Sequence, residues 1–291
     1  MIEIKNLSKS FGEVKAVDDL SITINTGING LVGENGAGKS TLLRLISDVY
    51  QKDDGDILID GANNNVIKNK NNLFFLSDAP YFPNNSTVKQ TFDFYATLFD
   101  LDEQRFSSIM ETLSLPLNRK ISTYSKGMTR QFFLAVALSS KVKYILLDEA
   151  FDGLDPLVLD TIKQEIIKDA DEKTYIVSSH NISSLERLCD NFILLSKGRC
   201  KKTGNIEHLG ENFTKYQLFL KEKIEQEDLE KLGYRVLSFK KLGSINNVVF
   251  YNEIDLSKIQ DHYHVILAEK IPIDSDELIA LEMLSARKEN N

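Results

Sequence analysis

Short apolar segments separated by polar turns recur through much of the chain and predict strands. Several are continuous apolar runs, which are typical of strands buried on both faces of a mainly parallel sheet. A helix is expected over 41–49, where Leu42 and Leu45 recur at helical spacing. Strands are expected at 2–7, 20–24, 28–32, 57–59, 73–76, 144–147, 175–177 and 192–195. The pattern therefore predicts an α/β fold around a mainly parallel core sheet.

The pattern changes twice farther along the chain. Between residues 84 and 140 it predicts helices, at 88–99, 103–113 and 126–139. After Gly204 it interleaves strands at 216–220, 235–239, 247–251 and 264–267 with helices at 228–232 and 276–286. We therefore expect a domain over 1–204 with a helical insert at 84–140, and a small α+β domain over 205–291. The Asn- and Lys-rich stretch 63–72 is interpreted as a loop.

A glycine-rich segment, residues 33–41, connects a predicted strand to a predicted helix. It has the pattern of a phosphate-binding loop in the context that such a loop requires. Backbone N–H groups and the helix N-terminus would bind phosphate oxygens, Lys39 would neutralise the β- and γ-phosphates, and Ser40 would offer its hydroxyl to Mg²⁺. The predicted nucleotide contacts here are Gly33, Asn35, Gly36, Ala37, Gly38, Lys39, Ser40 and Thr41. The alternative is a glycine-rich turn that binds no ligand.

Two carboxylates, Asp148 and Glu149, follow the strand predicted over 144–147. Ligand sites in parallel sheets lie at the carboxyl ends of the strands. We expect Asp148 to hold Mg²⁺ and Glu149 to act as the general base that polarises the attacking water. A strand that ends in Asp-Glu is by itself more often a solvated edge. The phosphate-binding loop upstream favours the catalytic interpretation.

The order of these motifs resembles the ATP-binding-cassette family over about residues 2–204. Phe-Asp-Gly-Leu-Asp follows the two carboxylates and ends at Asp155, and Tyr-Ser-Lys-Gly-Met precedes them and begins at Tyr124. The resemblance implies a P-loop NTPase with an antiparallel N-terminal β part. It also implies that Ser125 and Gly127, in the signature segment, contact the γ-phosphate held by a partner's phosphate-binding loop. Taken alone, Ser125 is simply a helix N-cap.

The resemblance gives roles to further positions. Asp155 lies in the segment that contacts the opposing subunit, and His180 is the switch histidine beside the γ-phosphate. Phe11 matches the aromatic residue that stacks on adenine, and Val17 is grouped with it as a predicted nucleotide contact. Without the motif order, His180 would be interpreted as structural and Phe11 as part of the core.

Two segments depart from the family's pattern. Lys126 and Met128 replace one Gly and the Gln of the signature, a form familiar among exporter ATPases whose membrane chain is separate. Asp78 stands where the family has a metal-contacting Gln, and its carboxylate is shorter, adds charge and lacks an amide donor. We expect altered coupling or turnover. The predicted Mg²⁺ ligands are Ser40, Asp78 and Asp148.

Composition narrows the function further. The formal charge of -8 disfavours a general nucleic-acid binder, which needs clustered basic residues. No apolar run approaches the roughly 20 residues of a membrane-spanning helix, and the first residues lack the layout of a signal peptide. The two cysteines are too few for a disulfide framework, which indicates a reducing compartment. We expect a cytoplasmic protein, peripheral on the cytoplasmic face of the cell membrane.

Each motif occurs once, so we expect a second cassette, in a homo- or heterodimer, to complete each ATP site. The chain resembles the ATPase subunits of exporters of peptides, antibiotics or lipids, including phenol-soluble-modulin exporters, that drive a separate transmembrane permease. Tyr81, Phe82 and Phe92 are expected to line a groove for that permease. The alternative is a soluble cassette acting on nucleic acid or ribosomes, which the acidic balance disfavours. His262 and His264 are interpreted as a surface pair on one strand face rather than a metal site.

Overall fold

The computed structural model describes residues 1–83, 85–180, 185 and 188–288. The chain forms two compact units, Met1–Ile206 and Glu207–Asn291. Residue 84, where the sequence placed the start of the helical insert, lies outside the described residues. Among the helices that are described, none combines the length and the apolar character needed to cross a membrane.

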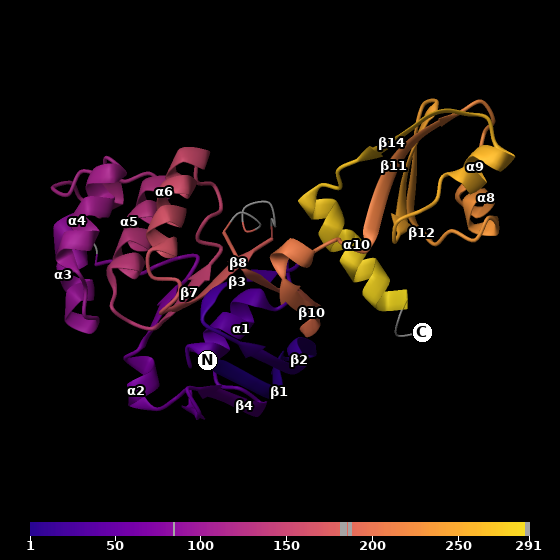
Figure 1. Cartoon of the computed structure of the whole chain (residues 1–291). Helices are drawn as coiled ribbons and strands as arrows, with labels where there is room; N and C mark the ends of the chain where they lie inside the picture. Colours follow the sequence, from indigo (N-terminus) through magenta and orange to yellow (C-terminus); the bar gives the residue numbers. More distant parts are fainter. Residues whose placement is uncertain (84, 181–184, 186–187, 289–291) are drawn as a thin grey trace. The chain divides into compact units, whose positions relative to one another are not determined.

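The N-terminal unit holds two sheets (Figure 1). The first is antiparallel, in the order β2-β1-β4-β5. The second has the order β10-β9-β3-β8-β7-β6, and β6, β7, β8, β3 and β9 run parallel while β10 is an antiparallel edge. The strands are β1 Ile2–Phe11, β2 Val14–Ile24, β3 Gly27–Val32, β4 Asp54–Ile59, β5 Ala62–Asn63, β6 Leu73–Leu76, β7 Tyr144–Asp148, β8 Thr174–Ser179, β9 Asn191–Ser196 and β10 Arg199–Asn205. The predicted mainly parallel core sheet and antiparallel N-terminal part are confirmed.

The helix α1 (Lys39–Ile46) packs between the two sheets. Leu42, Leu45 and Ile46 are buried in a core that also contains side chains of β1, β2, β4, β7 and β8. At about 25 cal/mol per Å² of buried apolar surface, this shared core holds the helix firmly against both sheets. The N-terminus of α1 and the loop before it are therefore fixed at the carboxyl end of β3.

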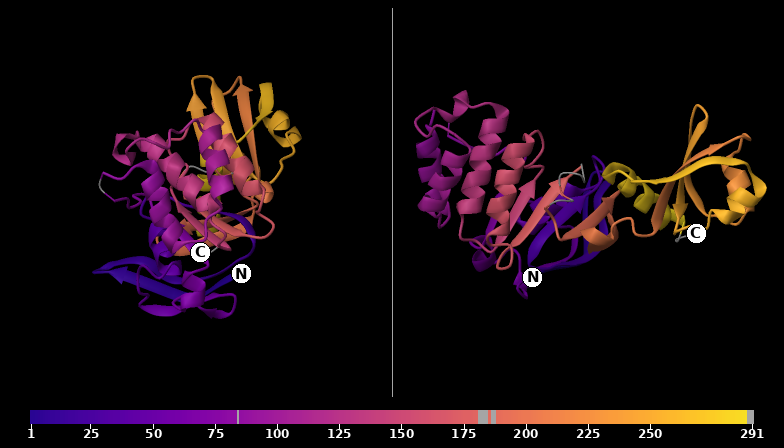
Figure 2. Two further views of the ribbon diagram at one scale, coloured as in Figure 1. Left: turned by 90° about the vertical axis from the view of Figure 1, so that its left-hand side faces the viewer. Right: turned by 45° about the horizontal axis from the view of Figure 1, so that its top comes forward.

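The helical insert gathers α3 (Val88–Leu98), α4 (Glu103–Thr112) and α5 (Lys126–Ser139), which stay together in each view (Figures 1 and 2). The first helix begins with a capping box, in which Thr87 and Gln90 each bond the other's backbone N–H. Every residue of α5 from Phe132 to Ser139 is buried. Among the described residues of this unit, the sequence missed two α-helices, α6 (Pro156–Ile167) and the short α2 (Ile67–Lys70). The interpretation of 63–72 as a loop is therefore wrong in part.

The C-terminal unit is an antiparallel sheet in the order β12-β13-β11-β14 with helices on both faces. Its element order is β11 (Phe213–Leu220), α8 (Gln226–Lys231), β12 (Val236–Leu242), β13 (Ile245–Tyr251), α9 (Ser257–His262), β14 (Val265–Ile271) and α10 (Ser275–Lys288). Up to β14 this is a split βαβ arrangement of the ferredoxin-like type. The sheet packs against α8 and α9 through Leu229 and Ile259, and against α10 through Leu278 and Leu281.

The pairing of His262 with His264 on one strand face is wrong. His262 ends the helix α9, where its Nδ1 lies 2.9 Å from the Lys258 carbonyl oxygen, and His264 precedes β14. The two residues therefore do not share a strand. The period-two spacing failed here because a helix ends between them.

Candidate functional site

The phosphate-binding loop closes around the Lys39 side chain. Its ammonium group donates hydrogen bonds to the carbonyl oxygens of Gly33, at 2.7 Å, and Glu34, at 3.2 Å. Burial lowers the pKa of Lys39, and the carboxylates of Glu149, Asp148 and Asp152 act in the opposite direction. Both of these hydrogen-bond acceptors of the buried cation are neutral carbonyl oxygens, so phosphate oxygens would add charge-assisted hydrogen bonds that the loop itself does not supply.

A cavity of about 270 Å³ lies over this loop. Its lining combines the residues from Asn35 to Thr41 with Glu149 and two residues of β2, Val14 and Ala16. The structure thus brings most of the predicted loop contacts together with the predicted general base. Gly33 stays below, where a Cβ would lie 2.4 Å from the Leu195 carbonyl oxygen. Side chains at Gly33 are excluded by packing, not by the ligand.

Gly38 has a specific structural task at the start of α1. Its φ is 103°, and a Cβ there would lie 2.3 Å from the Ala16 carbonyl oxygen. We expect Gly38→Ala to lower the free energy of unfolding by about 3 kcal/mol, because backbone strain and overpacking add. Gly61→Ala is the matched control, since Gly61 has a φ of 78° but nothing within 4 Å of an added Cβ. Urea unfolding followed by circular dichroism measures the free energy of unfolding. An equal decrease in Gly38→Ala and Gly61→Ala would contradict this account.

Asp148 is fully buried at the end of β7, and its two carboxylate oxygens differ in their hydrogen-bond partners. Oδ1 accepts hydrogen bonds from Ser178 at 2.7 Å and from Ser40 at 3.0 Å. Oδ2 has no hydrogen-bond partner within the described part of the chain. A buried oxygen without a donor costs free energy in an isolated chain, and a hard cation such as Mg²⁺ is the ligand that carboxylate and hydroxyl oxygens suit. The Asp148 and Ser40 oxygens therefore fit the predicted metal.

Arg44 was not predicted from the sequence, and it lies between two of the predicted metal ligands. Its Nη2 is 3.3 Å from Asp78 Oδ1 and 4.0 Å from Asp148 Oδ2. Asp78 is 55 % exposed, so its ion pair with Arg44 is only weakly stabilising. The pair nevertheless brings Asp78 to the same side of the site as Asp148. The charge that Asp78 adds in place of an amide is met by this guanidinium group.

Glu149 occupies a strained position. Its φ is 49°, in the left-handed region that non-glycine residues rarely adopt. Its N–H donates to Ser178 Oγ at 2.9 Å, and the same hydroxyl group donates to Asp148. Ser178 therefore links the two carboxylate residues, and it is a residue that the sequence analysis did not single out. Strain held in this way by neighbouring contacts is typical of functional sites.

His180 follows β8 and is 49 % exposed on its side chain. Its Nδ1 lies 3.2 Å from Oδ2 of Asp152. A carboxylate oxygen of Glu149, a carboxylate oxygen of Asp152 and a ring nitrogen of His180 all lie within 4.8 Å of one another. The predicted base and the predicted switch histidine therefore lie at one place, although they come from different strands of the sheet.

The signature segment begins α5. Ser125 caps the helix by accepting a hydrogen bond from the Met128 N–H at 3.1 Å, and it is exposed, as the N-cap interpretation also requires. Asp155 caps α6, where its Oδ1 accepts from the N–H groups of Leu157 and Val158. Neither Ser125 nor Gly127 lines the cavity over the phosphate-binding loop of its own chain.

Phe11 and Val17, which the sequence analysis grouped as nucleotide contacts near the adenine, differ in how exposed they are. Phe11 is 46 % exposed, makes an edge contact with Tyr50 with ring centroids 5.5 Å apart, and has Lys9 Nζ over its ring at 5.5 Å from the centroid. The prediction for the Val17 side chain needs correction: it is 1 % exposed and packs in the core. The register shifts in the pairing of β1 with β2 were invisible in the sequence, and the structure places Val14 and Ala16 at the cavity instead.

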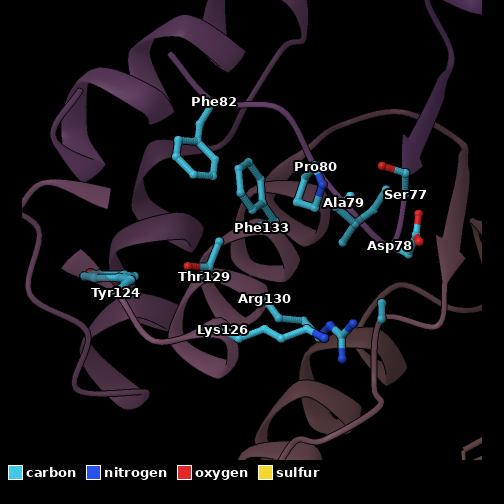
Figure 3. A pocket seen from close by; sticks show the side chains of 12 residues that line it. Ser77, Asp78, Ala79, Pro80, Phe82, Tyr124, Lys126, Thr129, Arg130 and Phe133 are labelled. Carbon is cyan, nitrogen blue, oxygen red and sulfur yellow. The ribbon is translucent and has the colours of Figure 1, made fainter. Parts of the chain in front are cut away.

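A second cavity, of about 310 Å³, lies where β6 meets the helical insert (Figure 3). Phe82 and Phe133 form part of its apolar lining, and Asp78, Lys126 and Arg130 bring charges to it. The prediction that Phe92 lines this groove is wrong, because Phe92 is 5 % exposed and stacks on Phe106 at a centroid distance of 4.0 Å. Tyr81 is 69 % exposed but does not line the cavity.

Comparison with known proteins gives one consistent result. Residues 17–152 match the ABC transporter family. The ABC transporter ATP-binding protein YtrB of Bacillus subtilis is 30 % identical over 75 % of this chain and 76 % of its own. The bacitracin transport ATP-binding protein BcrA of Bacillus licheniformis is 29 % identical, over 75 % of this chain and 74 % of its own. A dimeric post-hydrolysis cassette bound to ADP and phosphate shares the fold, with a TM-score of 0.62 and 21 % identity over 71 % of this chain and 99 % of its own.

Proposed function

The chain belongs to the ABC transporter family, as an ATP-binding and ATP-hydrolysing subunit, and from this premise we propose that it powers an exporter whose membrane permease is a separate chain. The cavity that joins residues 35–41 to Glu149 carries the proposal, because it places a phosphate-binding loop and a candidate base around one space. The relative named for bacitracin transport supports a peptide antibiotic or similar amphipathic cargo.

The residues divide the chemistry among them. Lys39 and the backbone N–H groups of the loop bind the phosphates, and the exposed ring of Phe11 stacks on the base. Ser40, Asp148 and Asp78 would hold Mg²⁺, which supplies charge neutralisation on the phosphate oxygens. Glu149 takes a proton from the attacking water. In phosphoryl transfer such positioning and electrostatic stabilisation supply most of the rate enhancement.

His180 completes the site beside Glu149, where one of its ring nitrogens is directed at the γ-phosphate. The cluster with Glu149 supports this role, since both residues reach the same space from adjacent strands. Asp155 holds the start of α6 and meets the opposing subunit across the dimer.

We place the second half of each ATP site on another cassette. Ser125 and Gly127 are absent from the lining of the cavity over their own phosphate-binding loop, and the solved cassette with the same fold is a dimer. The exposed N-terminus of α5 supports the role, because its N–H groups form an anion site. ATP then favours the closed dimer, and hydrolysis with phosphate release lets the dimer open.

Cross-linking between differently labelled copies tests this arrangement. We expect Asn35→Cys protein mixed with Lys126→Cys protein to form a disulfide-linked dimer in the presence of ATP, because the two loops meet across the closed interface. Neither protein alone should give that product, and Lys68→Cys in place of Lys126→Cys is the exposed control. Non-reducing gel electrophoresis measures the yield. A yield that ATP does not change would count against the proposed dimer.

The cavity near Phe82 and Phe133 is the place where we expect a segment of the permease to bind. Its apolar lining suits the apolar face of a short helix, and it adjoins Asp78, which contacts Arg44 of the nucleotide site. A location on the cytoplasmic face of the membrane follows from this partner. We also propose that the C-terminal unit serves dimerisation or regulation, because it has its own core and holds none of the candidate site residues.

A further inference from the structure

Asp152 is a third carboxylate beside the two residues that we expect to act on the γ-phosphate. It lies in the turn after β7, and its side chain is 23 % exposed. Its carboxylate falls within 4.8 Å of ligand atoms of both Glu149 and His180. The proposed function assigns no role to Asp152. Its side chain nevertheless contacts residues at the end of β8, in addition to the backbone hydrogen bond that closes the turn after β7.

Both carboxylate oxygens of Asp152 face the end of β8. Oδ2 lies 3.2 Å from His180 Nδ1, and Oδ1 accepts a hydrogen bond from Ser179 Oγ at 3.4 Å. The first contact holds the imidazole ring by one nitrogen, so Nε2 remains the atom that can reach a phosphate. The second contact limits rotation of the carboxylate itself. Together they fix the orientation of the His180 ring.

The backbone of Asp152 is held from two directions. Its N–H donates to the Glu149 carbonyl oxygen at 3.2 Å, and its own carbonyl oxygen accepts a hydrogen bond from Arg130 Nη1. Arg130 lies in α5, the helix that Ser125 caps, and it also lines the cavity proposed for the permease. Asp152 is therefore the common contact of α5 and His180.

We propose that Asp152 is a positioning residue for ATP hydrolysis. Its carboxylate orients the His180 ring through Nδ1, and Arg130 fixes the position of Asp152 relative to α5. The inference rests on the proposed function, because it takes His180 to act on the γ-phosphate. Asp152 acts through His180 and does not line the cavity over the phosphate-binding loop. Its loss should therefore lower turnover and leave ATP binding unchanged.

Two substitutions at Asp152 separate orientation from folding. Asp152→Ala should lower kcat by about 10-fold or more with KM for ATP unchanged, by analogy with the losses of about 10- to 100-fold on removing the partner that orients a metal-ligating histidine. Asp152→Asn should keep kcat within about threefold of the parent, because its amide oxygen still accepts from Nδ1 and its amide group can donate to Ser179. Equal losses in both variants, or a raised KM, would overturn the assignment.

A double-mutant cycle distinguishes this inference from the proposed function. In a His180→Ala background, Asp152→Ala should change the residual turnover by less than about twofold, because the two residues act as a unit. If His180→Ala retained parental turnover, the role of His180 in the proposed function would fail. If His180→Ala lost turnover while Asp152→Ala did not, only the inference about Asp152 would fail.

The imidazole itself gives a readout that turnover cannot mimic. The chain has four histidines, so the ¹⁵N resonances of His180 can be assigned with the His180→Ala protein. Asp152→Ala should shift the Nδ1 resonance, and an unchanged spectrum would contradict the contact. Arg130→Met should lower kcat, and the Arg130→Met, Asp152→Ala double variant should lose no more than Asp152→Ala alone. Arg119→Met, at an exposed site, should leave kcat at the parental value in both the parent and the Asp152→Ala background. Additive losses at Arg130 and Asp152 would remove Arg130 from the proposal.

Discussion

We expect Glu149→Gln protein to keep ATP bound and to hydrolyse it about 10²-fold or more slowly than the parent, the range for loss of a general base. The amide fills the same space and keeps the backbone contact to Ser178, but it cannot accept the proton of the attacking water. Because the triphosphate survives, the closed dimer should accumulate. Phosphate release measures the loss, and size-exclusion chromatography with ATP measures the dimer.

Glu172→Gln is the control for that variant, since it makes the same change at an exposed turn. It should keep parental turnover and form no more dimer in the presence of ATP than the parent does. Parental rates of phosphate release from Glu149→Gln protein would remove Glu149 from the role of base. Loss of ATP binding in the same variant would instead indicate that Glu149 supports the loop.

We expect Lys39→Ala to weaken ATP binding itself by about 10²-fold, because its cation would supply one or two charge-assisted hydrogen bonds of about 1.5–3 kcal/mol each. The ammonium group is already buried and bonded to the carbonyl oxygens of Gly33 and Glu34, so little reorganisation is needed when phosphate arrives. Isothermal titration with a non-hydrolysable ATP analogue measures the dissociation constant.

Lys39→Met separates charge from volume in the same experiment, because it keeps an unbranched apolar stem in the buried space. It should lose affinity as Lys39→Ala does, while its unfolding transition stays near that of the parent. Lys68→Ala removes an exposed lysine and should leave affinity unchanged. A dissociation constant for Lys39→Ala equal to that of the parent would refute the account of the loop.

The sequence predicted the elements whose patterns are local. The strand from Gly27 to Val32 and the helix after Gly38 were readable because apolar spacing and glycine positions are set within one segment. The strand β10 was missed because it is a polar edge, with little apolar surface to bury. The helix α6 begins with the cap Asp155 and Pro156, a start signal that the sequence analysis had assigned to a motif.

The site was predictable as a set of residue types and less so as a set of contacts. Asp148 and Glu149 were predicted because they follow an apolar strand, but the pairing of Arg44 with Asp78 joins positions that only the fold brings together. The same holds for Asp152 and His180, which come from the ends of β7 and β8. Val17 failed for a related reason, since irregular pairing between β1 and β2 decides which side chains face the nucleotide cavity.

The complete burial of α5 from Phe132 to Ser139 has a mechanical consequence. Interiors are close-packed, so those side chains cannot slide past their neighbours without opening voids. Ser139 and Ser140 also bond back to carbonyl oxygens of the last turn, which secures the far end. The buried end of α5 is therefore held in place by its neighbours, and we expect a displacement at Arg130 to move the first turn of the helix, with Ser125 at its N-cap, relative to that fixed end.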